Sequence, residues 1–348
     1  MKDVKIGVAV PSAAYAIGPK HLRYYRTLRK KPEHGDVVYG IVERIGEHSS
    51  LENKSGRIHM IHNGSLGIFV FGNRYAPDYF EGLIPDQFMP EVDLLARSGL
   101  VGVVKTKNSL RKDPTKIRVL GYVCTETGEI INTQDYCLIR PKNSAKRQPR
   151  AKMILVCGSS MNSGKSMAAV ACCWALSTLG YTVRASKVTG TASLKDILMM
   201  NDAGAQHYAD FTYIGHPSTY KLEKDKLLDI FNRLDLKYAN NPENYWVVEL
   251  ADGIIQRETA MLLACEEVKS RIHRLIFCAN DPFGVIGGLR ILKERFGLKP
   301  HAISGICSSS PLHIRELAEF TDIPVFNSVV ADLTGLKKML ISGKGDGS

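Results

Sequence analysis

The sequence has no apolar run that approaches the roughly 20 residues of a membrane-spanning helix. Its first residues, Met1 to Lys5, lack the hydrophobic core and the cleavage site of a secretory signal. No C-x-x-C pair occurs among its eight cysteines, and most of them lie singly inside apolar runs. These absences predict a cytoplasmic protein without a membrane span, whose thiols are reduced and buried. They also argue against a zinc site and against a disulfide framework.

Charge is unevenly distributed along the chain of 348 residues, which carries a formal net charge of +11. Residues 1–150 contain 24 Lys+Arg against 15 Asp+Glu, and the remainder contains 22 against 20. The asymmetry favours two units with different partners. A basic surface attracts nucleic acid, acidic protein or a phosphorylated ligand, and charge alone does not choose among them.

Residues 1–140 are expected to form a basic, β-rich domain. Short β-branched or alternating runs recur there, separated by turns rich in Gly, Asn and Pro, which is typical of a small barrel or sandwich. Two helices are expected to interrupt the strands, over residues 20–31 and 89–99. The stretch 72–82 combines Arg, Tyr, Phe, Asp and Glu, a composition suited either to ligand recognition or to an ordinary packed turn.

Residues 141–152 are basic, contain proline and lack apolar periodicity, so they are predicted to form a linker. From 153 to 341 the sequence pattern changes to one of alternating strands and helices. This indicates an α/β domain with a mostly parallel sheet that is covered on both faces. Buried strands are expected at 153–157, 182–188, 245–250, 274–279, 302–307 and 323–327. Helices are expected at 165–179, 193–203, 225–236, 259–268, 287–296 and 312–320. The tail 342–348 is expected to be disordered.

The strongest motif of the chain runs from Gly158 to Ser166 and resembles the phosphate-binding pattern G-x-x-x-x-G-K-[ST], with five residues in place of four between Gly158 and Gly164. A strand is predicted directly before it and a helix directly after it, which is the context that a phosphate-binding loop requires. Small residues let backbone N–H groups turn toward phosphate oxygens, and the helix N-terminus adds partial positive charge. Lys165 would reach the β- and γ-phosphates and the Ser166 hydroxyl would ligate Mg²⁺. The expected nucleotide contacts are Gly158, Ser159, Asn162, Ser163, Gly164, Lys165, Ser166 and Met167.

Charged side chains follow other predicted strands of the same domain. Glu249 and Asp252 come after the strand at 245–250, where a carboxylate for the metal belongs, although Asp-Gly is also a turn signal. Lys187 ends the strand at 182–188 and would face a phosphate or an acidic substrate, with hydroxyls from Thr189 and Thr191 nearby.

Two further side chains are weaker candidates of the same kind. Asp202 is available either to Mg²⁺ or to a helix cap. Arg257 could supply positive charge to a transferring phosphoryl group.

The order of these motifs resembles the dethiobiotin synthetase branch of P-loop enzymes over residues 153–330. The likeness rests on the loop from Gly158 to Ser166, on Lys187 to Gly190, on Asn201 to Ala203 and on Glu249 to Gly253. It extends more loosely to the run Phe283 to Leu289. ParA-like ATPases carry an extra lysine where this chain has Ser159, so that branch is disfavoured.

The resemblance implies ATP and Mg²⁺ as cofactors, with Lys165, Ser166, Asp202 and Glu249 around the metal and the phosphates. Lys187 would then face the substrate or its transferred group, which makes Lys165, Lys187 and Glu249 the expected catalytic residues. Members of this branch often form homodimers, so a homodimer is an expectation here as well. GTP in place of ATP is left open, and so is the acceptor.

Two functions follow from the sequence. The first is a Mg-ATP-dependent ligase or kinase that acts on a small molecule, since phosphoryl transfer needs positioned charges of this kind. The alternative is a nucleotide-dependent switch or assembly ATPase whose basic N-terminal domain binds a partner protein or nucleic acid.

Overall fold

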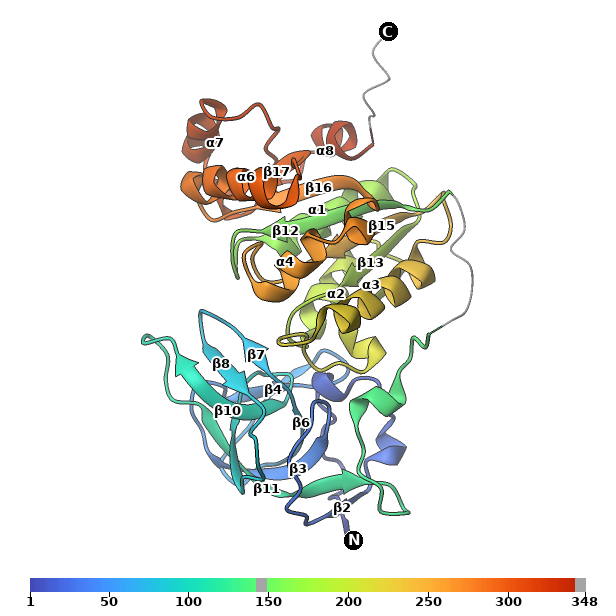
Figure 1. Cartoon of the computed structure of the whole chain (residues 1–348), viewed down its shortest axis with the longest axis vertical. Coiled ribbons are helices and arrows are strands. Elements are labelled where there is room, and N and C mark those ends of the chain that lie inside the picture. Colours follow the sequence, from blue (N-terminus) through green and yellow to red (C-terminus); the bar gives the residue numbers. More distant parts are fainter. Residues whose placement is uncertain (142–148, 342–348) are drawn as a thin grey trace. The chain divides into compact units, whose positions relative to one another are not determined.

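The computed structural model describes residues 1–141 and 149–341, and they form two compact units (Figure 1). The first unit contains Met1–Arg140, and the second contains most of the chain from Pro141 onward. Two later segments, Gly190–Lys195 and Phe211–Lys221, belong to the first unit, so the chain passes between the units five times. The sequence placed both segments in the domain 153–341. Part of the predicted linker lies outside the described residues. The predicted disordered tail 342–348 lies wholly outside them.

The first unit is built on a nine-stranded sheet of order β1-β2-β11-β3-β6-β10-β8-β7, with β9 paired to both β10 and β11. All pairs except β6 with β10 are antiparallel. Its core gathers large apolar side chains from several strands, among them Phe69, Phe71, Leu94 and Tyr122. The strands are β1 Lys2–Asp3, β2 Tyr24–Arg26, β3 Val37–Arg44, β6 Leu66–Phe71, β7 Arg74–Tyr75, β8 Phe80–Leu83, β9 Glu91–Leu94, β10 Leu100–Lys107 and β11 Thr115–Cys124, with a separate pair β4 Ser50–Glu52 and β5 Ile58–Met60.

The prediction of two helices in this unit is wrong. Residues 20–31 contain a single 3₁₀ turn, Pro19–His21, followed by strand β2, and residues 89–99 contain strand β9. Apolar residues three apart suggested a helix, but β2 pairs with β1 and β11, and β9 pairs with β10 and β11. Backbone pairing with strands distant in the sequence decides the conformation of such short segments. The other 3₁₀ turns of this unit are η1 Ser12–Ala14, η3 Thr133–Tyr136 and η4 Phe211–Ile214.

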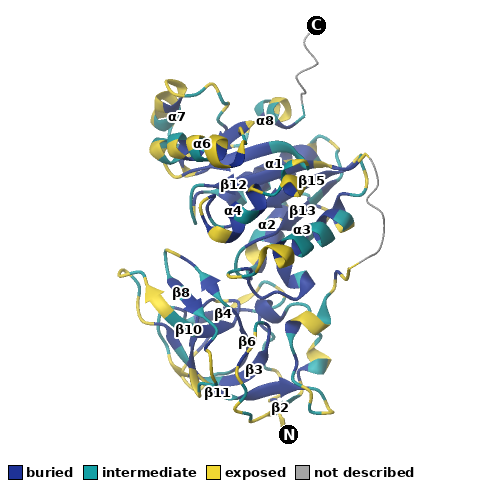
Figure 2. Cartoon of the chain, viewed as in Figure 1, coloured by how far each residue is buried: buried dark blue, intermediate teal, exposed yellow. Residues whose placement is uncertain are grey.

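The second unit has a six-stranded parallel sheet of order β14-β13-β15-β12-β16-β17, as the alternation of strands and helices predicted. Every residue of β15 is buried, as is every residue of β12 after Lys152, which shows that the sheet is covered on both faces (Figure 2). The strands are β12 Lys152–Gly158, β13 Val183–Lys187, β14 His207–Asp210, β15 Tyr245–Glu249, β16 Ile272–Cys278 and β17 Ala302–Ser304.

The helices of this unit lie close to the positions that the sequence predicted. They are α1 Lys165–Thr178, α2 Leu194–Asp202, α3 Lys224–Tyr238, α4 Arg257–Leu263, α5 Glu266–Lys269, α6 Pro282–Phe296, α7 Pro311–Ala318 and α8 Leu333–Leu340, with a 3₁₀ turn η5 at Ile306–Ser309. The sequence missed β14 and α8. It also predicted a strand at 323–327, where the structure has one bridge between Ile303 and Val325.

All eight cysteines are free, and six of them are buried, as expected. Burial raises the pKa of the Cys157 thiol to about 12. In the described part of the chain, each helix is too short or too polar to cross a membrane.

Candidate functional site

The predicted phosphate loop lies between a buried strand and a helix, as its sequence required. Strand β12 ends at Gly158, and α1 begins at Lys165. Asn162 and Gly164 both have positive φ, 58° and 89°, which turns the backbone sharply before the helix. Helix α1 starts without a side-chain cap and without an acidic residue in its first turn, so its first N–H groups have no side-chain acceptor at the cap.

Backbone from neighbouring strand ends packs tightly against this loop. Ile254 N donates to Gly158 O at 2.8 Å, and Ile306 N donates to Ser163 O at 3.3 Å. A side chain on Gly164 would meet the Gly305 Cα at 2.7 Å, and one on Gly253 would meet the Ser160 Cα at 3.1 Å. The glycines after β15 and β17 therefore let two other loops approach and hold the phosphate loop in shape.

Lys165 is buried and folds back over its own loop. Its ammonium donates to the Ser160 carbonyl at 2.6 Å and lies 3.5 Å from Ser163 Oγ. Both partners are neutral oxygens, so the positive charge of Lys165 is held at the loop without a carboxylate within ion-pair distance among the residues that the structure describes.

A cluster of four side chains lies at the carboxyl edge of the sheet, beside the start of α1. Ser166 Oγ is 3.2 Å from a carboxylate oxygen of Glu249, at the end of β15, and 3.2 Å from one of Asp196, in the first turn of α2. Lys187, the last residue of β13, donates to Asp196, and its Nζ lies 3.9 Å from Glu249 Oε1. The strands are parallel, so their carboxyl ends meet at one edge and bring these groups together.

The electrostatics of this cluster are set by burial and by opposite charge. Burial alone would lower the pKa of Lys187, but Asp196 and Glu249 outweigh it and the pKa is raised. Burial raises the pKa of Glu249 against the opposing effect of Lys187. Glu249 is 1% exposed, and its Oε2 has no hydrogen-bond partner among the described residues.

The structure brings together Lys165, Ser166, Lys187 and Glu249, which the sequence singled out, but it does not bring Asp202 to them. Asp202 is exposed at the last residue of α2, and in the described residues no hydrogen bond or ion pair joins it to the cluster. Asp196, six residues earlier on the same helix, is the α2 carboxylate that lies beside Ser166. The sequence carried no local signal for Asp196, because its position depends on where α2 begins.

Several other candidates have structural roles. Arg257 pairs with Glu258 at 2.8 Å and Glu223 at 3.1 Å. The Thr189 hydroxyl donates to the Ala251 carbonyl, so it supports the turn after β15. In the stretch 72–82, Arg74 and Phe80 are buried on the hairpin β7–β8, as an ordinary packed turn would have them.

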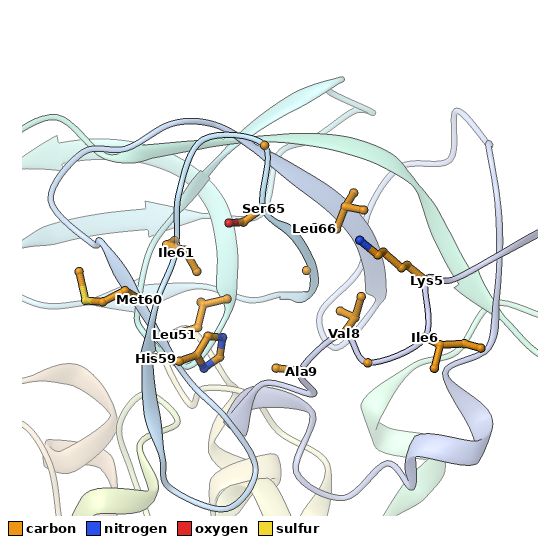
Figure 3. Close-up of a pocket in the computed structure, with 13 residues that line it drawn as sticks. Lys5, Ile6, Val8, Ala9, Leu51, His59, Met60, Ile61, Ser65 and Leu66 are labelled. Atoms are coloured by element: carbon orange, nitrogen blue, oxygen red, sulfur yellow. The ribbon is translucent and has the colours of Figure 1, made fainter.

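The first unit has a separate pocket of about 360 Å³ (Figure 3). Its lining comes from the N-terminal segment, from the pair β4–β5 and from the start of β6, and includes Leu51, Ile61, Leu66 and Lys5. Ile6 and Met60 at this pocket are 98% and 61% exposed. A partner protein or nucleic acid for this unit stays a prediction.

In the described residues no group of three or more His, Cys, Asp or Glu side chains is placed to hold a metal ion by itself. The cluster offers two carboxylates and one hydroxyl instead. Mg²⁺ is commonly held by one or two carboxylates together with substrate phosphates, and that donor set fits this cluster.

Comparison with known proteins finds matches among solved structures. No family model and no curated protein matches the chain. Among solved structures, it is similar to the signal recognition particle receptor FtsY from Elizabethkingia anophelis in complex with GDP, with a TM-score of 0.37 and 8% identity. The match covers 61% of this chain and 70% of that one. The resemblance to the dethiobiotin synthetase branch stays a prediction, and the function is inferred from this chain's own residues.

Proposed function

We propose that the second unit binds a nucleoside triphosphate with Mg²⁺ on the loop Gly158–Ser166 and transfers its terminal phosphoryl group to a small-molecule acceptor. This makes the chain an ATP-dependent kinase or ligase, in keeping with its resemblance to the dethiobiotin synthetase branch. The observation that carries the proposal is the convergence of the loop with Lys187, Asp196 and Glu249 at one edge of the sheet.

Each group of the site has a role in this proposal. The loop amides and the N-terminus of α1 hold the phosphates, and Lys165 leaves the Ser160 carbonyl to neutralise the β- and γ-phosphates. Ser166, Glu249 and Asp196 hold Mg²⁺, and the buried, unpartnered Oε2 of Glu249 supplies an open lone pair for it. Bound Mg²⁺ would supply charge neutralisation at the transferring phosphoryl group.

Lys187 is the group that would face the acceptor. It ends the strand β13, two strands from the loop strand β12, and its ammonium is within ion-pair distance of both carboxylates of the cluster. A carboxylate, carbamate or phosphate on the acceptor would suit it.

The test is removal of the loop cation. Lys165→Ala should lose ATP and GTP turnover by about a hundredfold or more, because phosphoryl transfer relies on charge neutralisation and positioning. Binding of a fluorescent triphosphate analogue with Mg²⁺ and release of inorganic phosphate would both be measured. Offering both nucleotides also separates ATP from GTP.

The matched control is Lys224→Ala, which removes the same charge from an exposed position at the start of α3. It should leave binding and turnover unchanged. Undiminished hydrolysis in Lys165→Ala, with the folded state intact by circular dichroism, would exclude the proposed site.

A further inference from the structure

Lys187 occupies an unusual position for a residue that is meant to hold an acceptor. Its side chain is 9% exposed, and its ammonium is bound between Asp196 and Glu249, the two carboxylates that also contact Ser166. An ammonium paired in this way has little positive charge left for a third anion.

The same two carboxylates, together with the Ser166 hydroxyl, form the donor set that a divalent cation would need. Ser166 Oγ contacts one oxygen of each carboxylate at 3.2 Å, so hydroxyl and carboxylates converge on one small volume. The Lys187 ammonium lies within ion-pair distance of both carboxylates. Glu249 is buried and Asp196 is half-buried, and two such carboxylates side by side repel one another unless a cation lies between them, as Lys187 does here.

Glu249 Oε2 is the second observation that points to a ligand. This oxygen is buried, and none of the described residues donates to it. Lys187 therefore satisfies the pair of carboxylates only in part, since one oxygen remains available to a cation with more coordination positions than an ammonium has.

We propose that Lys187 is the resident cation of the metal site while no metal is bound, and that it exchanges its carboxylates for the acceptor when a divalent cation binds. With the cation bound, Lys187 gives up Asp196 and Glu249, and its ammonium becomes available to an anionic group. The inference rests on the proposed function and adds an order of events, in which metal binding precedes acceptor binding.

The divalent cation and Lys187 compete for the same two carboxylates, so the effect of each on the other can be measured. If a divalent cation displaces Lys187 from its carboxylates, then removal of Lys187 must strengthen binding of that cation in the absence of nucleotide. The same displacement must expose the Lys187 amine to reagents in solution.

The first experiment uses the wild-type full chain and trace labelling with acetic anhydride, read at each lysine by mass spectrometry. Mn²⁺ alone, and Mn²⁺ with a non-hydrolysable ATP analogue, are the probes. Labelling of Lys187 should rise by about threefold or more with Mn²⁺ alone, because its two ion pairs are lost. Exposed Lys195 on α2 serves as the internal reference and should not change.

The second experiment compares Lys187→Met with Lys195→Met, which removes an equal charge one residue from Asp196. Mn²⁺ affinity, measured by electron paramagnetic resonance, should increase about tenfold or more in Lys187→Met only. An equal increase in both variants would mean a general effect of charge and would overturn the inference. If Lys187→Met does not fold, the labelling result decides alone.

The outcomes separate this inference from the function on which it rests. Mn²⁺ binding with unchanged or lower Lys187 labelling overturns the role of Lys187 and leaves the phosphate site standing. Absence of both Mn²⁺ and nucleotide binding removes the proposed function, and the inference with it.

Discussion

His48 is held as a neutral, buried imidazole in the first unit. Its Nε2 lies 2.9 Å from the Leu95 carbonyl and 2.9 Å from Nη1 of Arg74. Burial, and then the positive charge of Arg74, lower the pKa of His48 to about 3. Protonation of this ring therefore destabilises the folded state.

The pH dependence of stability follows from that shift. The unfolded chain, in which the pKa of His48 is near 6.5, binds a proton that the folded chain does not, so this contribution is complete above that pH and declines toward pH 3. Between about pH 7 and about pH 4.5 it should amount to a loss of about 2–3 kcal/mol. Urea denaturation of wild type and His48→Gln at both pH values measures it.

The variant should lose less stability than wild type over that interval. His62→Gln, at an exposed position of the same unit, should behave as wild type. Equal losses in wild type and His48→Gln would contradict the assignment.

For individual residues, the sequence predicted the site residues whose positions follow from local sequence pattern. It missed Asp196, whose position depends on tertiary contacts. Lys165 and Ser166 belong to a contiguous motif, and Lys187 and Glu249 end buried strands, so the sheet brings them together. Asp196 depends on the start of α2. That start is set in the first unit, where Glu52 accepts from Leu194 N at 3.0 Å and from the Ser12 hydroxyl at 2.5 Å. Contacts this distant in sequence leave no local pattern.

Among the elements, the loop after β17 packs directly against the phosphate loop. Gly305 has a φ of 100°, and a Cβ there would meet the Ser163 carbonyl oxygen and would lie 2.7 Å from the Ala279 oxygen. Any side chain at this position must push the two loops apart.

Gly305→Ala should therefore weaken binding of the triphosphate by about tenfold or more, because the loop amides lose their geometry. Gly180→Ala is the matched control, since Gly180 also has a positive φ, 86°, but an added Cβ meets no atom within 4 Å. It should cost about 1–2 kcal/mol of stability from backbone strain and leave nucleotide affinity unchanged. Titration with a fluorescent analogue and urea denaturation separate the two effects, and equal affinities in both variants would contradict the packing argument.

The elements of the second unit were more predictable than those of the first for a physical reason. Buried parallel strands are continuous apolar runs, as in β12 and β15, and they alternate with long helices. In the first unit, β2 and β9 are three and four residues long and take their conformation from partners far along the chain. Short segments of this kind carry too little periodicity to separate strand from helix.

For the whole molecule, the grouping of residues 190–195 and 211–221 with the first unit is the main finding that the sequence did not predict. Leu138 N and Ile139 N both donate to the Tyr213 carbonyl, at 2.8 and 3.1 Å, and the Thr133 hydroxyl donates to Gly215 O at 2.6 Å. Phe211 and Ile214 are buried. The first unit is completed by chain that comes after the phosphate loop.

A fragment of residues 1–140 should therefore fail to form a stable fold, since it would leave backbone donors and apolar surface without partners. Near-ultraviolet circular dichroism and urea denaturation would show no cooperative transition. Addition of a peptide of residues 211–221 should restore part of the signal, whereas a scrambled peptide should not. A cooperative transition of the fragment alone, equal to that of the full chain, would contradict this.

The five passages of the chain between the units also constrain how such a gene can change. A single crossover at the 141–152 boundary would transplant an N-terminal unit without the two segments that finish it, and would leave foreign segments in the recipient. Substitutions in 190–195 and 211–221 must then be accepted together with those in 1–140, as in an obligate pair of subunits. The two halves of this chain are expected to be inherited as one.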